Sequence, residues 1–427
     1  MMKQLVEKTA AEQEVLPGDL MTNRQRAQLV LVLGALVAIG PLTIDMYLPA
    51  LPAITSGLET TETAVQLTLT GTLVGLALGQ LLLGPLSDVI GRRKPLLAGL
   101  VLHIVASVLC VFAPDIAVLG VLRVLQGLGV AASAVVATAI VRDLFSGSSF
   151  ARIFSRLMLV MGIAPILAPT LGSAMLGWTD WRGVFAALAV LGVLLIIVAA
   201  LRLPETLPTA RRRRGGVGAT LRDYRRLLND RAFVGLVLVA GLAMAALFAY
   251  VSGSSFVLQE QYGLDEQEFG IAFGAGAVGL IAATQFNVRL LRWFTPQQIL
   301  ASALIAGTAF GVLLIVVAAT GFGGLGALLA ILWLVLAATG LAMPNAPALA
   351  MSRHSEAAGT AAALLGAVQF GIGAFSAPLA GLFGTGAVPM AVVIAGGMAA
   401  ALAVMLLVVP RAALNETVDP DLAVGLH

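Results

Sequence analysis

Long apolar runs alternate with shorter polar segments along almost the whole chain. Each run has about 18 residues or more, which suffices for a helix to cross a hydrocarbon core of about 30 Å. The pattern predicts an all-α membrane protein with twelve transmembrane helices. We expect these helices near residues 27–53, 64–87, 95–113, 117–142, 153–177, 183–203, 233–257, 269–291, 297–320, 324–349, 358–383 and 387–409.

The longest polar segment between two runs lies at the midpoint of the chain and contains the arginine run Arg211–Arg214. A long basic linker at this place predicts two six-helix bundles joined by a tether. We expect the arginine run to contact anionic lipid and to fix the topology. The predicted parts are an N-terminal tail (1–26), an N-terminal bundle (27–203), a basic linker (204–232), a C-terminal bundle (233–409) and a C-terminal tail (410–427).

Charge supports this organisation and predicts an orientation. Hydrophobic residues make up 59% of the chain and charged residues 11%, against about 25% charged residues in soluble domains. If both termini are cytoplasmic, 23 of the 25 Lys and Arg lie on the cytoplasmic side, the exceptions being Arg123 and Arg182. Cytoplasmic termini therefore satisfy the positive-inside rule. The single cysteine, Cys110, excludes an internal disulfide. The first apolar run follows a polar tail, so we do not expect a cleaved signal.

Only two ionisable residues, Asp45 and Arg123, lie well inside apolar runs. Charges at such depth are costly and mark candidate functional residues. Counted from the outer helix ends, both lie roughly 9–12 Å below the outer surface, so they could face one cavity. Asp45 could bind and release a proton under the control of Arg123, which stays protonated. The alternative is a static ion pair that ties the first helix to the fourth.

A charged cluster follows the second helix, in the segment that runs from Gly84 to Lys94. Its position at the cytoplasmic surface suits a latch between helix ends that is made and broken as the protein changes shape. The predicted latch residues are Gly84, Asp88, Gly91, Arg92 and Arg93.

Polar and aromatic residues inside the helices are candidates for a substrate cavity. For the polar ones a hydrogen bond between helices is the more common role, and an anchor at the membrane interface is nearly as compatible with Tyr47. The candidates are Tyr47, Gln126, Phe248, Tyr250, Asn345 and Gln369. His103 is expected to be a packed residue, with a proton-relay role as the alternative. No metal-ligand spacing, nucleotide-binding loop or nucleophile constellation occurs, so we predict no catalytic residue, no metal and no cofactor.

Small residues at every fourth position form stripes on four helices, as in Gly71, Gly75 and Gly79 or in Gly270 and Gly274. Such stripes let membrane helices approach closely. Static packing within a bundle and a smooth surface between two rocking bundles are both compatible with them.

These motifs resemble the major facilitator superfamily, and within it the drug:proton antiporters of the Bcr/CflA type. The latch segment is similar to the signature between helices two and three, although Ser87 and Val89 depart from it. The segment around Arg123 and Gln126 resembles the helix-four motif. Helix five resembles the antiporter motif in Pro165, Pro169 and Gly172, with Ala164, Ala168 and Ser173 where glycines are usual.

The resemblance implies alternating access by two bundles around a central cavity, lined largely by helices one, four, seven and ten. It implies proton-coupled efflux of small amphipathic compounds, such as bicyclomycin or chloramphenicol-like drugs, across the inner membrane. The proton gradient would supply the energy, and the chain would act as a monomer without a nucleic-acid partner. The alternative on the same fold is a proton-coupled importer or exporter of a small metabolite. A membrane enzyme or receptor is the rival class.

Overall fold

The computed structural model describes residues 16–18, 20–212, 217–354 and 357–410. Throughout these residues the regular structure is helical, without strands. Twelve helical segments are long and apolar enough to cross a membrane, and each overlaps one of the twelve apolar runs. The prediction of an all-α protein with twelve transmembrane helices is therefore confirmed.

The N-terminal bundle consists of helices from the first half of the chain. Within it, α4 packs along α6, α5 packs against α6 and α8, and α2 packs against α7. Its elements are α2 (Asn23–Asp45), η1 (Leu48–Ala50), α3 (Leu51–Gly57), α4 (Glu62–Ile90), α5 (Arg93–Val111), α6 (Ile116–Leu144), α7 (Gly147–Leu176) and α8 (Trp181–Arg202).

The C-terminal bundle is built in the same way from the second half, with α12 packed against α13 and α16, and α10 against α14 and α16. Two linker helices, η2 (Thr209–Arg211) and α9 (Val217–Asn229), precede it. Its elements are α10 (Arg231–Ser255), the π-helix η3 (Phe256–Gln261), α11 (Glu266–Leu290), α12 (Pro296–Thr320), α13 (Gly324–Ser352), α14 (Ala358–Ala374), α15 (Ser376–Gly381) and α16 (Ala387–Leu407).

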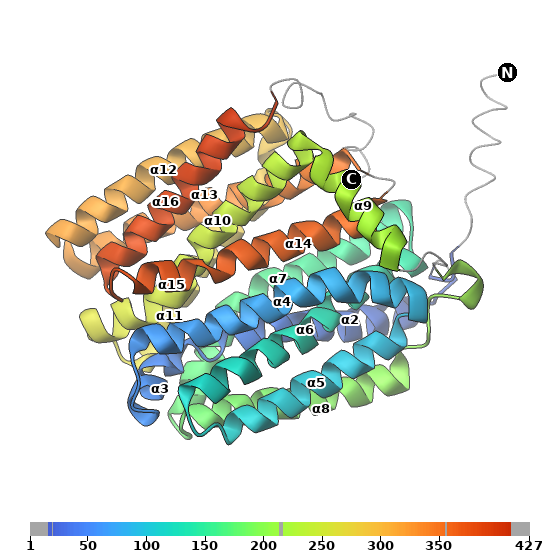
Figure 1. Cartoon of the computed structure of the whole chain (residues 1–427), viewed down its shortest axis with the longest axis horizontal. Coiled ribbons are helices and arrows are strands. Elements are labelled where there is room, and N and C mark those ends of the chain that lie inside the picture. The colour runs from blue at the N-terminus through green and yellow to red at the C-terminus, as the bar shows by residue number, and fades with distance from the viewer. Residues whose placement is uncertain (1–15, 19, 213–216, 355–356, 411–427) are drawn as a thin grey trace.

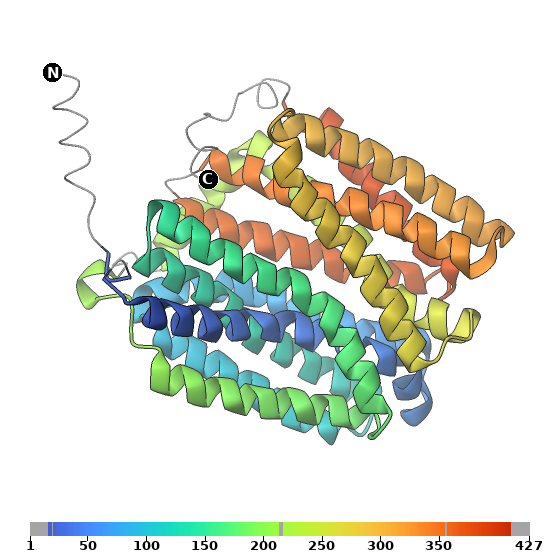
Figure 2. The same cartoon turned by 180° about the vertical axis from the view of Figure 1, so that it is seen from behind.

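The two bundles meet along two seams, where α4 faces α14 and α15 and where α7 faces α11. Figures 1 and 2 show these helices between the outlying pairs α5–α8 and α12–α16. We call the end at which α4 passes into α5 the basic end, and the end that carries α3 and η3 the acidic end. The linker helix α9 lies at the basic end (Figure 1).

The first transmembrane segment is not one continuous helix. α2 ends at Asp45, a turn carries Tyr47, and the chain resumes as η1 and α3. Pro49 and Pro52 lack the N–H that would donate to the carbonyl four residues earlier, so the helix cannot continue with its hydrogen bonds intact. The break places Asp45 at a helix end in the protein interior, where it is 6% exposed.

Two of the small-residue stripes have different surroundings. Gly71, Gly75 and Gly79 face α6 of their own bundle, so this stripe is static packing. Gly270 and Gly274 of α11 instead face α7 of the other bundle. Of these two stripes, only the second has the position that a rocking surface requires.

Asp230 fixes the start of the C-terminal bundle. Its Oδ1 accepts hydrogen bonds from the N–H groups of Ala232 at 2.9 Å and Phe233 at 3.3 Å, and its Oδ2 lies 2.9 Å from Nε2 of His354 and 3.5 Å from Nε of Arg353. Burial alone would raise the pKa of Asp230, but these hydrogen bonds and the charge of Arg353 outweigh it and hold the pKa below its ordinary value. The ionised carboxylate therefore stabilises the folded state.

The sign of this effect predicts a pH dependence of stability. Because the folded pKa of Asp230 is lowered, its contribution is present above its ordinary pKa of 3.8 and disappears as pH falls through the folded value. Asp230→Asn keeps a capping side chain but loses the charge, and we expect it to cost about 1–2 kcal/mol at neutral pH. Thermal unfolding in detergent should show a gap between wild type and variant at pH 7 that closes near pH 3; a gap independent of pH would contradict this assignment.

Candidate functional site

Arg123 lies on α6 at the centre of the N-terminal bundle and is fully buried. Its Nη1 donates hydrogen bonds to the carbonyl of Thr43 at 3.0 Å and to Oε1 of Gln126 at 2.6 Å. The guanidinium lies 4.1 Å from the ring centroid of Tyr47 and 5.7 Å from that of Phe185. A carbonyl, an amide and two aromatic faces thus stabilise the buried charge without a carboxylate.

Asp45 is close to this site in the chain but is not paired with Arg123. Among the described residues its carboxylate forms no ion pair and no hydrogen bond. Three residues after Asp45, the carbonyl of Leu48 accepts a hydrogen bond from Ser255 of α10, so Asp45 lies close to the boundary between the bundles. The alternative interpretation of Asp45 and Arg123, a static ion pair that ties the first helix to the fourth, is therefore not seen in this structure.

Buried polar atoms next to Arg123 also lack partners. Among the residues that the structure describes, Nε and Nη2 of Arg123 have no hydrogen-bond acceptor, and the two ring nitrogens of His103 form no hydrogen bond. The backbone carbonyl of His103 accepts a bond from Ser107, whose hydroxyl in turn accepts one from Gln126 at 2.8 Å. Two donors of the guanidinium are thus not used by the protein atoms that the structure describes.

The predicted latch is centred on Arg92 at the basic end. Its side chain forms an ion pair with Asp88, donates to Oγ of Ser87 at 2.8 Å, and donates to both carboxylate oxygens of Asp143 at 2.8 and 3.2 Å. Burial would lower the pKa of Arg92, but Asp143 and Asp88 raise it above its ordinary value. The guanidinium stays ionised and joins the end of α4 to the end of α6.

Glu205, from the start of the linker, completes this cluster. Its carboxylate accepts the backbone N–H of Arg92 at 2.8 Å and that of Arg93 at 3.3 Å, and thereby caps the start of α5. Burial would raise the pKa of Glu205, but these bonds and the nearby Arg212 lower it. Gly91 makes room for the carboxylate: its φ is 99°, and a Cβ atom there would overlap Glu205.

The acidic end is closed by hydrogen bonds that cross between the bundles. Their donors are neutral side chains and their acceptors are backbone carbonyls. From the C-terminal bundle, Oγ of Ser255 donates to the carbonyl of Leu48 at 2.7 Å, and Nε2 of Gln259 donates to that of Pro49 at 3.3 Å. From α4, Nε2 of Gln66 donates to the carbonyl of Ser252 at 3.3 Å, and Oγ1 of Thr70 donates to that of Ala374 at 2.9 Å. From α7, Oγ of Ser173 donates to the carbonyl of Glu266 at 2.6 Å.

Helix five reinforces this closure. α7 runs through Pro165 and Pro169 as one helix, and Gly172 lies against the break in the first segment. A Cβ atom at Gly172 would lie 1.9 Å from the carbonyl oxygen of Met46. Only glycine permits so close an approach of α7 to the residue next to Asp45.

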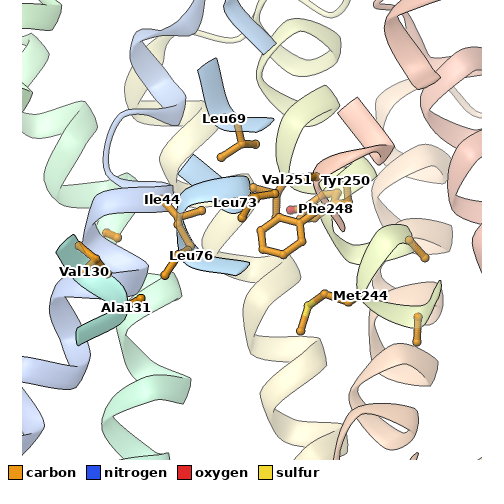
Figure 3. Packing of buried hydrophobic residues seen from close by; sticks show 14 of the residues in the cluster. Ile44, Leu69, Leu73, Leu76, Val130, Ala131, Met244, Phe248, Tyr250 and Val251 are labelled. Carbon is orange, nitrogen blue, oxygen red and sulfur yellow. The ribbon is translucent and has the colours of Figure 1, made fainter. Parts of the chain in front are cut away.

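A cavity of about 220 Å³ lies at the opposite, basic end. Segments of α2, α4, α6, α7 and α14 line it, and its polar wall includes Gln80, Asp88, Arg92 and Arg142. Buried apolar side chains of both bundles form one cluster, in which Phe248 of α10 and Leu73 of α4 take part (Figure 3). The molecule is therefore hollow at one end and sealed at the other.

None of the six predicted substrate residues lines this cavity. Tyr47 donates or accepts a hydrogen bond with Thr68 at 3.0 Å, Gln126 holds Arg123, and Asn345 donates to Asn287 at 2.7 Å. Phe248 and Tyr250 are buried, whereas Gln369 is partly exposed. The cavity wall lacks α10 and α13, the seventh and tenth transmembrane segments, because the apolar residues of α10 pack into the closed centre. The substrate roles of the six residues stay predictions.

Sequence analysis missed the partners of the latch and of the closure. Asp143 and Glu205 lie 51 and 113 residues from Arg92, so local spacing gives no sign of them. A signal did exist for one contact of the closure: Pro378 follows the acceptor Ala374 by four residues. A proline at that spacing leaves the earlier carbonyl without its helical partner.

The geometry of the latch predicts unequal roles for its two aspartates. The Asp143 side chain is 14% exposed and makes the two-point contact with Arg92, while that of Asp88 is 38% exposed. We expect Asp143→Asn to lower the free energy of unfolding by about 2 kcal/mol, as for hydrogen bonds to charged groups, and Asp88→Asn to cost clearly less. Thermal unfolding in detergent measures both, and an equal or larger loss in Asp88→Asn would refute the ranking.

A second prediction distinguishes the two latch glycines. Gly91→Ala is strained by its positive φ and overlaps Glu205, so we expect a loss of about 1–3 kcal/mol. A Cβ atom at Gly84 meets no atom closer than 3.8 Å; Gly84→Ala should be neutral and serves as the matched control. An unfolding temperature of Gly91→Ala equal to that of wild type would contradict the prediction.

Comparison with known proteins places this geometry in a family. The sequence profile of the Major Facilitator Superfamily matches residues 33–378. An uncharacterized MFS-type transporter, YdgK of Bacillus subtilis, is 38% identical over 86% of this chain and 92% of its own length. The chloramphenicol resistance protein of Pseudomonas aeruginosa is 33% identical over 81% of this chain and 82% of its own. A bicyclomycin resistance protein homolog of Haemophilus influenzae is 29% identical over 84% and 90%.

Solved structures share the architecture. The crystal structure of a D-xylose-proton symporter superposes with a TM-score of 0.71 at 15% identity, covering 93% of this chain and all of that one. The human organic anion transporter MFSD10 superposes with a TM-score of 0.63 at 19% identity, covering 89% and 99%. At these identities the likeness concerns the fold alone. The chain therefore belongs to the Major Facilitator Superfamily, as its motifs predicted, and is a multi-pass protein of the bacterial inner membrane.

Proposed function

We propose that this protein exports small amphipathic organic compounds across the inner membrane in exchange for protons. The observation that carries the proposal is its similarity, over four fifths of both chains, to a protein named for chloramphenicol resistance. The bicyclomycin resistance homolog supports the same substrate class. The membrane gradient supplies the energy, so the protein needs no resident cofactor.

The basic end would face the cytoplasm. Its arginines, from Arg92 and Arg142 to Arg289 and Arg353, agree with the positive-inside rule. In this orientation the 220 Å³ cavity opens toward the cytoplasm, from which a compound to be exported must enter. The hydrogen bonds at the acidic end then close the outer side in the same conformation.

Asp45 would be the proton carrier. In this conformation its carboxyl group is buried and forms no ion pair or hydrogen bond within the described part of the chain. Two donors of Arg123 are available nearby, so an ionised Asp45 would gain an ion pair by turning toward the guanidinium. Proton binding to Asp45 would then be coupled to the conformation of the chain at the break in the first transmembrane segment.

Exchange follows if the substrate and the proton favour opposite states of Asp45. A compound entering from the basic end would promote release of the proton, and a proton from the outer side would promote release of the compound. Each ligand shifts the equilibrium only through its different affinity for the two states. The contacts of Arg92 are formed in this conformation, in which the basic end is open, and would hold the end of the N-terminal bundle together as the bundles move.

The proposal predicts proton release on substrate binding. When chloramphenicol is added to purified wild-type protein in weakly buffered detergent solution, we expect the medium to acidify. Asp45→Asn should release no protons, because the variant has no carboxyl group to lose one. Asp180→Asn, at an exposed helix cap, is the matched control and should behave like wild type.

Transport in vesicles separates the alternatives. A pH gradient, acidic on the side that the acidic end faces, should drive chloramphenicol toward that side with wild type and not with Asp45→Asn. Accumulation on the opposite side would indicate an importer instead. Full gradient-driven transport by Asp45→Asn would refute the proton role.

A further inference from the structure

The linker helix α9 (Val217–Asn229) lies outside the twelve transmembrane segments but has exposed apolar residues. Leu227 is 1% exposed and anchors one face, whereas Leu221 is 66% and Leu228 56% exposed. Seven residues apart, these two leucines lie on the same side of the helix, two turns from each other. A surface helix in water would rarely place two leucines in this way.

Arginines lie beside the apolar strip that Leu221 and Leu228 form on α9. Arg222 and Arg225 are exposed on the part of α9 that faces away from the protein. At 100° per residue, Arg225 lies beside the leucine strip and Arg222 lies beyond it. An apolar strip bordered by cations is the pattern of a helix that lies in the headgroup region of a membrane.

α9 is held at this place by both bundles. It packs against α10 and α14 of the C-terminal bundle, and its position at their ends is seen in Figure 1. From the other side, the hydroxyl of Tyr224 donates a hydrogen bond to the carbonyl of Leu81 in α4 at 3.1 Å. That carbonyl has no helical partner because Pro85 follows four residues later.

We propose that α9 is a binding surface for anionic phospholipid, in which Leu221 and Leu228 enter the edge of the hydrocarbon and Arg222 and Arg225 bind lipid phosphates. Guanidinium groups pair well with phosphate oxygens, and arginines at a membrane surface are attracted by anionic lipid. The positive charge at the border of the strip selects a lipid of opposite sign.

Lipid on α9 would act on the conformation of the basic end. The Tyr224 hydroxyl bonds α4 one turn before Gly84 and Pro85, which line the cavity. Because α9 contacts both bundles, movement of one bundle against the other must change at least one of these contacts. A membrane surface that holds α9 in place therefore favours the conformation in which the Tyr224–Leu81 bond is intact.

The single cysteine permits a direct test. Cys110 is buried; replacing it by alanine and introducing Leu221→Cys gives one site for a bimane fluorophore on α9. The labelled protein is reconstituted into nanodiscs of phosphatidylcholine, with or without phosphatidylglycerol. Quenching by nitroxide-labelled lipid reports contact with the hydrocarbon edge, and quenching by iodide reports contact with water.

We expect strong lipid quenching and weak iodide quenching in discs that contain phosphatidylglycerol. The double substitution Arg222→Gln and Arg225→Gln removes both positive charges. We expect it to weaken the dependence of lipid quenching on phosphatidylglycerol about tenfold or more, since each arginine near an anionic surface contributes to binding. The matched control, Arg289→Gln with Arg292→Gln, removes the same charge from another exposed segment at the basic end and should leave the quenching unchanged.

Three results would overturn the proposal. Equal lipid quenching with and without phosphatidylglycerol would mean that the arginines do not select anionic lipid. Dominant iodide quenching would place the leucine strip in water. Quenching by neither reagent would mean that another part of the chain covers Leu221. Because the substituted side chains are exposed, unchanged unfolding temperatures verify that the variants fold.

Discussion

A carbonyl that loses its amide partner inside a membrane must find another donor, and this constraint places the contacts that hold the molecule together. Water is absent from the hydrocarbon region, so an unpaired carbonyl costs several kcal/mol. At three prolines, Pro85, Pro344 and Pro378, a side chain from another helix reaches the carbonyl four residues earlier. The acceptors and their donors are Leu81 with Tyr224, Gly340 with Thr284, and Ala374 with Thr70. The last of these bonds joins the bundles, and the first joins the linker to α4.

The two ends differ in the strength of their contacts. At the acidic end, neutral side chains bond to carbonyls across the bundles, and each such bond contributes only about 1 kcal/mol net. They can be broken singly at modest cost when water enters. At the basic end, the ion pairs of Arg92 with Asp88 and Asp143 join α4 to α6, and its backbone N–H donates to Glu205 of the linker. The strong contacts keep the N-terminal bundle rigid, and the weak ones close it against its partner.

The twelve transmembrane segments could be predicted because hydrophobicity and length determine them directly. Asp45 and Arg123 could be selected for the same reason, as charges in apolar surroundings. Their relation could not be predicted: similar depth suggested a pair, whereas the break after Asp45 turns the chain so that Arg123 meets a carbonyl, an amide and the Tyr47 ring. The acceptor Asp143 and the position of the cavity depend on how helices pack, which apolar periodicity does not specify.

In the proposed exchange, the separation of Asp45 from Arg123 lets one site respond to two ligands. In this conformation Arg123 is held by a carbonyl, an amide and two aromatic rings, so its charge does not depend on Asp45. Asp45 would therefore carry a proton here without leaving the buried guanidinium without any partner, a loss that costs roughly 3–5 kcal/mol when a buried ion pair is broken. The two donors of Arg123 that have no acceptor among the described residues would attract the carboxylate only once it has lost its proton. The proton on Asp45 would thus decide between two arrangements of the residues where the bundles meet.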